Sequence, residues 1–275
     1  MHFRFIPLIP DPLLKPYVAK MWVFESGGKL PEFERKLIVP NANFKLALTY
    51  RNGIVSRIGN TAFVQKENEL KVSGLIDVPV VLDAGEDIPT GTIGIELNPA
   101  GAYRLFKMPF QEMTNQIVGI DEVLGKRAIY LQERLADTNS VSHKIHLLQE
   151  FLIRQLGQTE ADPIYDYCVH RITNSQGILS IGQLEKETGY TSRWLHTKFT
   201  NHLGTNPKNL SAILRFKQFY EAFSTGAEFK ALKNHIYSHY YDQSHFLRAF
   251  KRFTGTTPTD LQKNINQLST EAFKA

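Results

Sequence analysis

The side chains best suited to chemistry lie in two segments of the second half of the chain, residues 191–207 and 242–258. The two segments align without a gap at an offset of 51 positions, so they form an internal repeat. Each copy of a repeat usually forms the same structural unit, so we interpret the two segments together. The identical positions pair Phe199 with Phe250, Gly204 with Gly255, Thr205 with Thr256 and Pro207 with Pro258.

Helical spacing assigns two faces to each copy. Apolar residues four positions apart, Leu195 with Phe199 and Phe246 with Phe250, predict a buried face. Arginine, glutamine, serine and threonine are the side chains that bind base edges in the major groove, whereas lysines at helix ends bind phosphates. The outward positions are Arg193, His196, Thr197, Thr200, Gln243, Ser244, Leu247, Arg248 and Lys251, and the predicted phosphate contacts are Thr200, Lys208, Lys251 and Arg252.

Charge distribution supports this interpretation. The chain has 275 residues and a net charge of +5, and residues 190–252 hold ten basic residues against three acidic ones. Any one of the outward residues would also fit an ordinary solvated helix face. Two copies with the same face, inside the most basic stretch, favour a surface that binds DNA phosphates.

A shorter helix is predicted before each copy. Ser180 and Gln183 have capping-box spacing, and Gly189 suits the turn before the first copy. In the second copy, residues 230–238 form the predicted leading helix and residues 239–241 the turn. A helix over residues 209–224 joins the two copies, so the pattern indicates two helix-turn-helix units in an all-α domain.

Residues 178–261 resemble the DNA-binding domain of the AraC/XylS family of bacterial transcription regulators. The strongest matches are residues 241–258 and the segment Arg215-Phe216-Lys217 of the joining helix. The resemblance implies helix-turn-helix units at about 178–204 and 229–255, double-stranded operator DNA as partner, and RNA polymerase as a further partner of an activator. It also implies that bases in successive major grooves are contacted by Arg193, His196, Thr197, Gln243, Ser244 and Arg248.

The sequence departs from the family pattern at three positions. The family usually has a small residue four positions before the turn glycine, and Glu185 and His235 stand there instead. The turn glycine of the second unit is replaced by His239, which must adopt a left-handed or adjusted backbone at some cost. These substitutions would affect the affinity of either unit for DNA more than the fold.

The first half has a β-rich pattern, with expected strands at residues 36–40, 44–50, 70–76, 78–82 and 91–97. Short strands at this spacing indicate a barrel or sandwich. The family resemblance implies a cupin-like β-barrel sensor followed by helices, which gives an α+β chain with a small-molecule effector in the sensor. Residues 98–106 and 120–125 are similar to the poorly characterised N-terminal domain of one branch of these regulators.

An apolar stripe runs along the helix expected over residues 140–156 and consists of Val141, Ile145, Leu148 and Leu152. It fits either the core of its own domain or the contact surface of a homodimer. Residues 157–163 form a polar segment that ends at a proline. We therefore expect a β-rich sensor and dimerisation domain over 1–157 and the DNA-binding domain over 163–265.

The sequence offers little for catalysis. The single cysteine, Cys168, excludes an internal disulfide and has no nucleophile motif around it. His143 and His146 are three positions apart on a predicted helix and could bind a metal together, but a pair of solvent-facing histidines is the simpler interpretation. We expect no catalytic residue, metal, cofactor or membrane span, and a cytoplasmic protein. Two alternatives remain: an alkyl-transfer repair enzyme fused to the same DNA-binding domain, and a nonspecific architectural DNA-binding protein.

Overall fold

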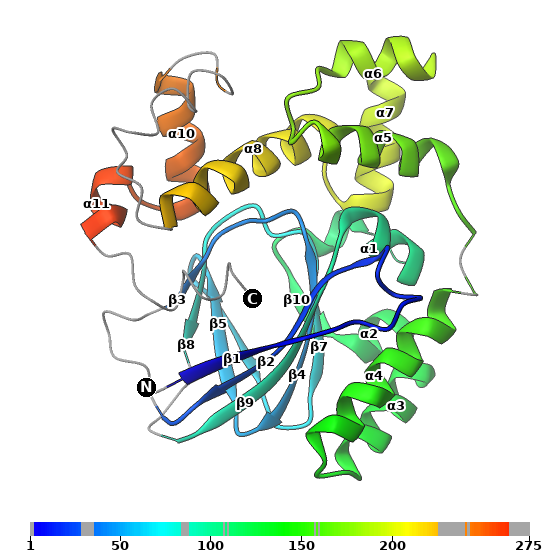
Figure 1. The fold of residues 1–275 in the computed structure, drawn as a ribbon, viewed down its shortest axis with the longest axis vertical. Helices are drawn as coiled ribbons and strands as arrows, with labels where there is room; N and C mark the ends of the chain where they lie inside the picture. The colour runs from blue at the N-terminus through cyan, green and yellow to red at the C-terminus, as the bar shows by residue number, and fades with distance from the viewer. Residues whose placement is uncertain are drawn as a thin grey trace.

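A computed structural model describes residues 3–28, 36–83, 88–106, 108, 110–156, 158, 160–224, 240 and 243–263. Within this part of the chain an antiparallel β-domain comes first and helices follow (Figure 1). The predicted α+β class, with a β-rich domain at the N-terminus and a helical C-terminal region, is confirmed.

Two antiparallel sheets form the β-domain and curve around a shared interior (Figure 1). The larger sheet has the strand order β1 (Phe3–Leu8), β2 (Val18–Ser26), β9 (Thr90–Leu97), β4 (Phe44–Arg51), β7 (Leu70–Ser73) and β10 (Ile117–Gly119). The smaller sheet has the order β3 (Lys36–Ile38), β8 (Val80–Asp83), β5 (Ile54–Ile58) and β6 (Thr61–Gln65).

The sequence pattern did not predict the first two strands, β1 and β2. Strand β1 contains Pro7 and lies at the edge of the larger sheet, where a residue without an N–H group is tolerated. Strand β2 pairs with both β1 and β9, and its Trp22 lies opposite Gly94. A Cβ atom at Gly94 would lie 2.2 Å from Cζ2 of Trp22, so the glycine makes room for the indole ring on the sheet.

Five helical elements come after β9 and cover the β-domain, with β10 between the second and the third: α1 (Pro99–Leu105), η2 (Phe110–Met113), α2 (Ile120–Leu124), α3 (Lys126–Ala136) and α4 (Val141–Leu156). The apolar stripe on α4 packs inward. Leu148 and Leu152 are each 1% exposed, and Val141 and Ile145 are half-buried against the same core. This burial corrects the expectation that the stripe is a dimer surface, because the two leucines could not contact a second chain without leaving their own core.

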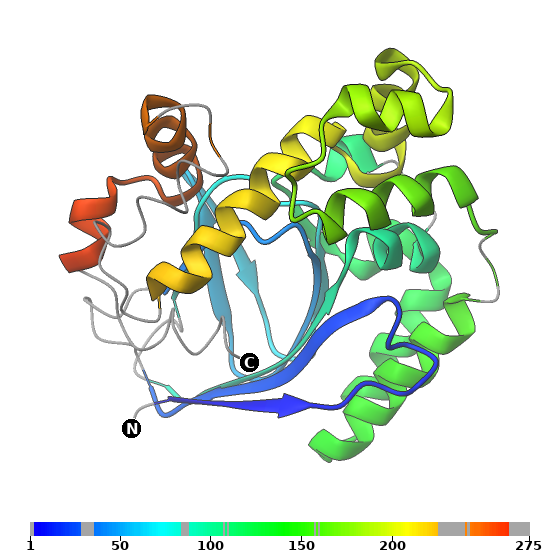
Figure 2. The same ribbon diagram turned by 45° about the horizontal axis from the view of Figure 1, so that its top comes forward.

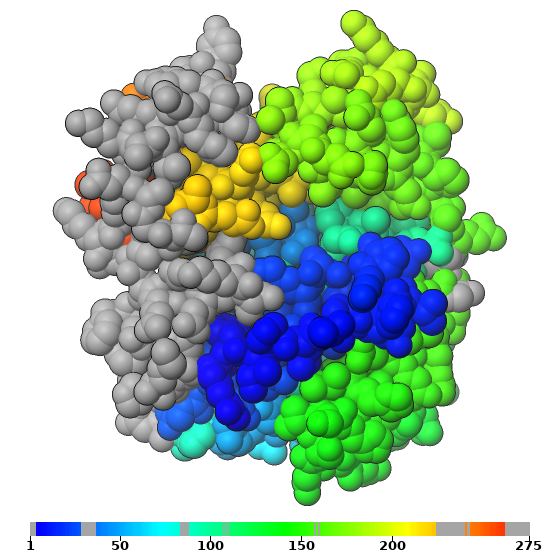
Figure 3. Space-filling model, in the orientation of Figure 1, coloured from blue at the N-terminus to red at the C-terminus, as the bar shows by residue number. Residues whose placement is uncertain are grey.

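The helical region contains α5 (Pro163–Asn174), α6 (Ile181–Thr188), α7 (Ser192–Leu203), α8 (Pro207–Ser224), α10 (Gln243–Thr254) and α11 (Pro258–Lys263). The long helix α8 lies across one end of the β-domain, with α5–α7 on one side and α10 on the other (Figures 1 and 2). In Figure 3 α8 is the yellow band between the green α5–α7 region and the blue N-terminal strands.

Aromatic packing joins α8 to α10. Phe219 contacts Phe246 at 4.7 Å between ring centroids, and Phe216 contacts Phe250 at 5.7 Å. The predicted leading helix at 230–238 lies outside the described residues, as do His235 and His239. The domain boundary between α4 and α5 stays a prediction. No helix in the described ranges is long and apolar enough to cross a membrane.

Candidate nucleic-acid interface and cavity

The first helix-turn-helix unit has the capping that its sequence predicts. The Ser180 hydroxyl accepts the backbone N–H of Gln183 at 3.2 Å, and α6 ends at Gly189 with φ 74°. The Thr191 hydroxyl accepts the backbone N–H of Trp194 at 3.3 Å and caps the start of α7. Helix α7 ends at Gly204, which has φ 77°. Both glycines occupy the left-handed region, where a side chain would cost free energy.

Glu185 has a structural role at the position where the family usually has a small residue. Its carboxylate accepts the backbone N–H of Ser192, which is one of the unpaired donors in the first turn of α7. A negative group is also favourable at a helix N-terminus. The departure from the family pattern at this position therefore fixes α6 to the start of α7.

Helix α7 separates an apolar face from a polar face. Leu195 and Phe199 are fully buried, whereas Arg193, His196 and Thr197 are exposed. The Thr197 hydroxyl donates to the Arg193 carbonyl at 3.2 Å, which leaves its lone pairs on the outer face. The predicted positions of the three polar side chains are therefore found, and their role in base recognition stays a prediction.

Helix α10 has the same arrangement. Phe246 and Phe250 are fully buried. Gln243, Ser244 and Arg248, the three predicted base contacts on this helix, are exposed. Leu247, Lys251 and Arg252 are exposed as well.

The four predicted phosphate contacts are in different surroundings. Lys208 and Lys251 are exposed, and Thr200 is half-buried with its hydroxyl donated to the His196 carbonyl at 2.7 Å. Arg252 forms an ion pair with Asp77 of the β-domain. All four residues therefore reach the surface of the helical region, and Arg252 is also paired with the N-terminal half.

Helix α7 contacts α1 and the start of α5, and no sequence motif indicated these contacts. Tyr103 of α1 stacks on His202 of α7 at 4.0 Å between ring centroids, and His202 Nε2 lies 2.9 Å from Asp162. Lys198 also pairs with Asp162. Burial disfavours the charged form of Asp162, but bonds from Lys198, the Tyr165 backbone and His202 outweigh it and lower the pKa.

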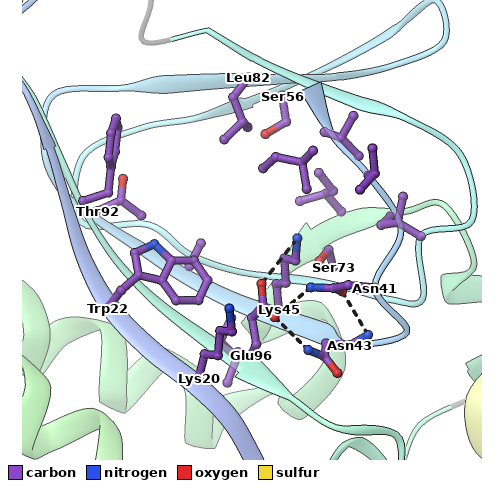
Figure 4. Close-up of a pocket in the computed structure, with 18 of the residues that line it drawn as sticks. Lys20, Trp22, Asn41, Asn43, Lys45, Ser56, Ser73, Leu82, Thr92 and Glu96 are labelled. Carbon is purple, nitrogen blue, oxygen red and sulfur yellow. Dashed lines mark hydrogen bonds and ion pairs between the residues drawn. The ribbon is translucent and has the colours of Figure 1, made fainter. Parts of the chain in front are cut away.

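A cavity of about 160 Å³ lies between the two sheets and α8. Its apolar walls come from both sheets and include Trp22, Phe24, Leu46, Ile54 and Leu82. Figure 4 shows Lys20, Lys45, Asn41, Asn43 and Glu96 gathered at one end, away from Leu82 and Ser56.

Glu96 is buried at the polar end of the cavity. Its carboxylate accepts the side-chain amides of Asn41 at 2.8 Å and Asn43 at 2.7 Å, and Lys45 Nζ lies 3.6 Å away (Figure 4). Burial lowers the pKa of Lys20, Glu96 opposes that shift, and Lys217 and Lys45 add to it. The charged form of Lys20 is therefore disfavoured by two neighbouring lysines and favoured by Glu96 and Glu221.

The cavity lining has more positive than negative charge. Four lysines line it, Lys20, Lys45, Lys71 and Lys217, against two glutamates, Glu96 and Glu221. The Thr92 hydroxyl, also in the lining, is buried and has no hydrogen-bond partner among the described residues. These residues come from strands and a helix far apart in the sequence, so no local motif could have indicated them.

The alternative of a catalytic thiol finds no support at Cys168. The side chain is fully buried, and this burial raises the pKa of the thiol to about 11. A thiol needs a lowered pKa and access to react. His143 and His146 are exposed, and the described residues hold no group of three or more metal-binding side chains.

Comparison with family models now assigns the helical region. A model described as "Helix-turn-helix domain" matches residues 184–264. The C-terminal region is an AraC-type helix-turn-helix DNA-binding domain. The predicted family resemblance is therefore confirmed. A second model, described as "Domain of unknown function (DUF6597)", matches residues 7–119 of the β-domain.

Solved structures that are similar to this chain include ToxT from Vibrio cholerae. ToxT bound to (E)-4-(8-methylnaphthalen-1-yl)but-3-enoic acid has 12% identity and a TM-score of 0.48, over 97% of this chain and 100% of that chain. A Cupin_2 domain of an XRE family regulator from Enterobacter cloacae has 11% identity and a TM-score of 0.29, over 35% of this chain and 96% of that chain. A comparison with curated protein sequences finds no significant match.

Proposed function

We propose that this AraC-type protein is a sequence-specific, ligand-responsive transcription regulator that binds operator DNA through α7 and α10. The observation that supports it best is the exposed polar face of each helix, opposite an aromatic and aliphatic face that is fully buried. The side chains on these faces are of the types that hydrogen-bond to base edges. Such a protein works in the cytoplasm, where the chromosome of a bacterium lies.

Each group of residues has a distinct role in this proposal. Arg193 and Arg248 donate two hydrogen bonds to a guanine, and their neighbours on each helix complete the base contacts. Lys208, Lys251 and Thr200 contact phosphates, which fixes the register of the protein on DNA without selecting a sequence.

The proposal is tested with the full-length chain. A pool of random duplexes is selected for binding and sequenced, and the affinity for the enriched duplex and for an unselected duplex is then measured at several salt concentrations. A regulator prefers the enriched duplex by about 10³-fold or more, and both affinities fall steeply with salt. Equal affinity for both duplexes supports the architectural alternative, and no binding at low salt contradicts a role on DNA.

The cavity is the proposed effector site. An apolar cavity of about 150 Å³ holds a molecule the size of benzene, and this one is of similar size. The excess of lysines over glutamates in the lining favours an anionic group on the ligand. We therefore propose a small amphipathic anion, with its apolar part against Trp22 and its charge near Lys20.

A pair of probes that differ only in charge tests this ligand class. We compare benzoate with benzamide, its neutral amide, using the melting temperature of the full chain and calorimetric titration. The carboxylate should raise the melting temperature more than the amide does, and Lys20→Met should remove that difference. Equal effects of the two probes would exclude the charge-based part of the proposal.

Two further partners stay predictions. An activator would contact RNA polymerase, and a homodimer would raise the effective concentration of the DNA-binding helices on a two-site operator. A dimer surface would have to be one other than Leu148 and Leu152, which are buried.

A further inference from the structure

Asp77 lies where the β-domain meets both parts of the DNA-binding domain. Its carboxylate accepts the side-chain amide of Asn115 at 2.8 Å and that of Asn209, in the first turn of α8, at 3.0 Å. The same carboxylate oxygen that accepts from Asn209 also pairs with Arg252 in the last turn of α10. Asp77 is buried, so one shielded carboxylate joins three segments that are far apart in the sequence.

A second contact holds the same end of α10. Gly255, which follows the helix with φ 75°, lies against Pro79, since a Cβ atom at Gly255 would be 3.4 Å from Pro79 Cγ. The end of α7 is held in a comparable way, because the Thr114 hydroxyl donates to the Gly204 carbonyl at 2.7 Å. The β-domain therefore contacts the C-terminal end of both helices that carry the proposed base contacts.

The segment that holds α10 also borders the cavity. Ile76 and Val80 line the cavity, while Asp77 and Pro79, between them in sequence, contact α10 and the glycine after it. A molecule in the cavity would therefore touch the same short segment that binds Arg252. This arrangement gives a direct mechanical route from cavity occupancy to α10.

Arg252 could bind either of two anionic partners, the Asp77 carboxylate or a DNA phosphate. A guanidinium binds carboxylate and phosphate in the same forked geometry, so Asp77 and a DNA phosphate compete for it. The Arg252 side chain is 49% exposed, which leaves it accessible from the solvent side, whereas the Asp77 side chain is 12% exposed.

We propose that Asp77 is a latch that withholds Arg252 from DNA and that is released when α10 binds the phosphate backbone. The inference rests on the proposed function, because Arg252 can be withheld only from a partner that the protein binds. Binding DNA then requires breaking the Asp77–Arg252 pair, so the latch lowers the affinity of the resting protein. Ligands that shift residues 76–80 change the strength of the latch and thereby change DNA affinity.

A double-mutant cycle on the full chain tests the latch with a 30-base-pair duplex of random sequence as probe. We measure binding of the wild type, Asp77→Asn, Arg252→Ala and the double variant at several salt concentrations. Asp137→Asn is the matched control, because it makes the same change in charge at an exposed position after α3.

Asp77→Asn should tighten binding about tenfold, more than Asp137→Asn does, because Arg252 gains a phosphate contact. Arg252→Ala should change wild-type affinity less than about twofold. In the Asp77→Asn background the same substitution should remove the gain and reduce the salt slope by about 1. Equal effects of Arg252→Ala in both backgrounds, or no gain beyond the charge control, would overturn the latch.

The outcomes separate the two proposals. If the wild type and all variants fail to bind duplex at low salt, the DNA-binding function itself is contradicted. If the wild type binds and Asp77→Asn binds no better than the charge control, only the latch is contradicted. Should Asp77→Asn lower the melting temperature strongly, Asp77→Ser replaces it in the cycle, because its hydroxyl can still accept the amide of Asn209.

Discussion

Three arginines on the two exposed helices differ in what surrounds them. Arg193 and Arg248 are exposed on the outer faces of α7 and α10, while Arg252 pairs with Asp77. The same side chain therefore occurs in two surroundings: it faces the solvent on the outer face of each helix, and it pairs with a buried carboxylate at the end of α10.

Replacing Arg193 or Arg248 by alanine should cost about 1–3 kcal/mol on the best duplex, because a two-bond contact to guanine is lost. The preference at that base should weaken as well. Lys251→Ala is the comparison: as a phosphate contact it should weaken selected and random duplexes equally and lower the salt slope. Fluorescence anisotropy titrations measure all three variants, and a uniform loss for the arginine variants would contradict their assignment to bases.

Cys168 should be inert in the folded protein. Burial raises its pKa to about 11, so the reactive thiolate is scarce at neutral pH and the sulfur is shielded. A colorimetric disulfide reagent at pH 7.5 should label Cys168 only after denaturant is added. Stoichiometric labelling of the native chain within seconds would revive the alternative of a catalytic thiol.

At the scale of elements, α4 shows that the spacing of apolar residues identifies a buried face without identifying what packs against it. Helix α4 packs on α3 and α1, and the two leucines of its stripe lie fully within the core. Its hydrophobic pattern reflects intramolecular packing, as amphipathic helices of globular proteins usually do.

Leu148→Ala should lower the free energy of unfolding by about 2–5 kcal/mol, because it removes buried methyl groups and leaves a cavity. Ile129→Ala on α3 is the control, since Ile129 is 47% exposed and should change stability by less than about 1 kcal/mol. Urea denaturation measures both variants. A fully stable Leu148→Ala would mean that the residue does not belong to this core.

At the scale of the whole molecule, α8 connects the parts. It supplies Lys217 and Glu221 to the cavity, its aromatic face packs on α10, and its first turn reaches Asp77 through Asn209. Two sets of contacts therefore connect the cavity lining with α10, one through α8 and one through residues 76–80.

The packing of α7 against α1 and the start of α5 should weaken in mild acid. Burial lowers the pKa of His202 below 6.5, and its bond to Asp162 only partly offsets this. The unfolded chain then binds more protons at this site than the folded chain, so stability falls as pH falls below about 6.5. His202→Gln should flatten the dependence of melting temperature on pH between 7 and 5, and an unchanged slope would contradict this role of His202.

The sequence by itself determined the features that depend on neighbours along the chain. The caps at Ser180 and Thr191, the turn glycines and the four-residue spacing of Leu195 and Phe199 predict the helices and their faces, because these signals act within one or two helical turns. The repeat then extended the prediction to α10, whose aromatic residues are buried as expected.

Only the tertiary structure decided which surfaces meet. Asp77 and Arg252 are 175 positions apart, and Lys20 and Lys217 come from opposite ends of the chain, so no local pattern links either pair. The stripe on α4 shows the same limit, because spacing identifies an apolar face without identifying what covers it. Such contacts depend on how the sheets curve and where α8 crosses them, which is set by the packing of the whole core.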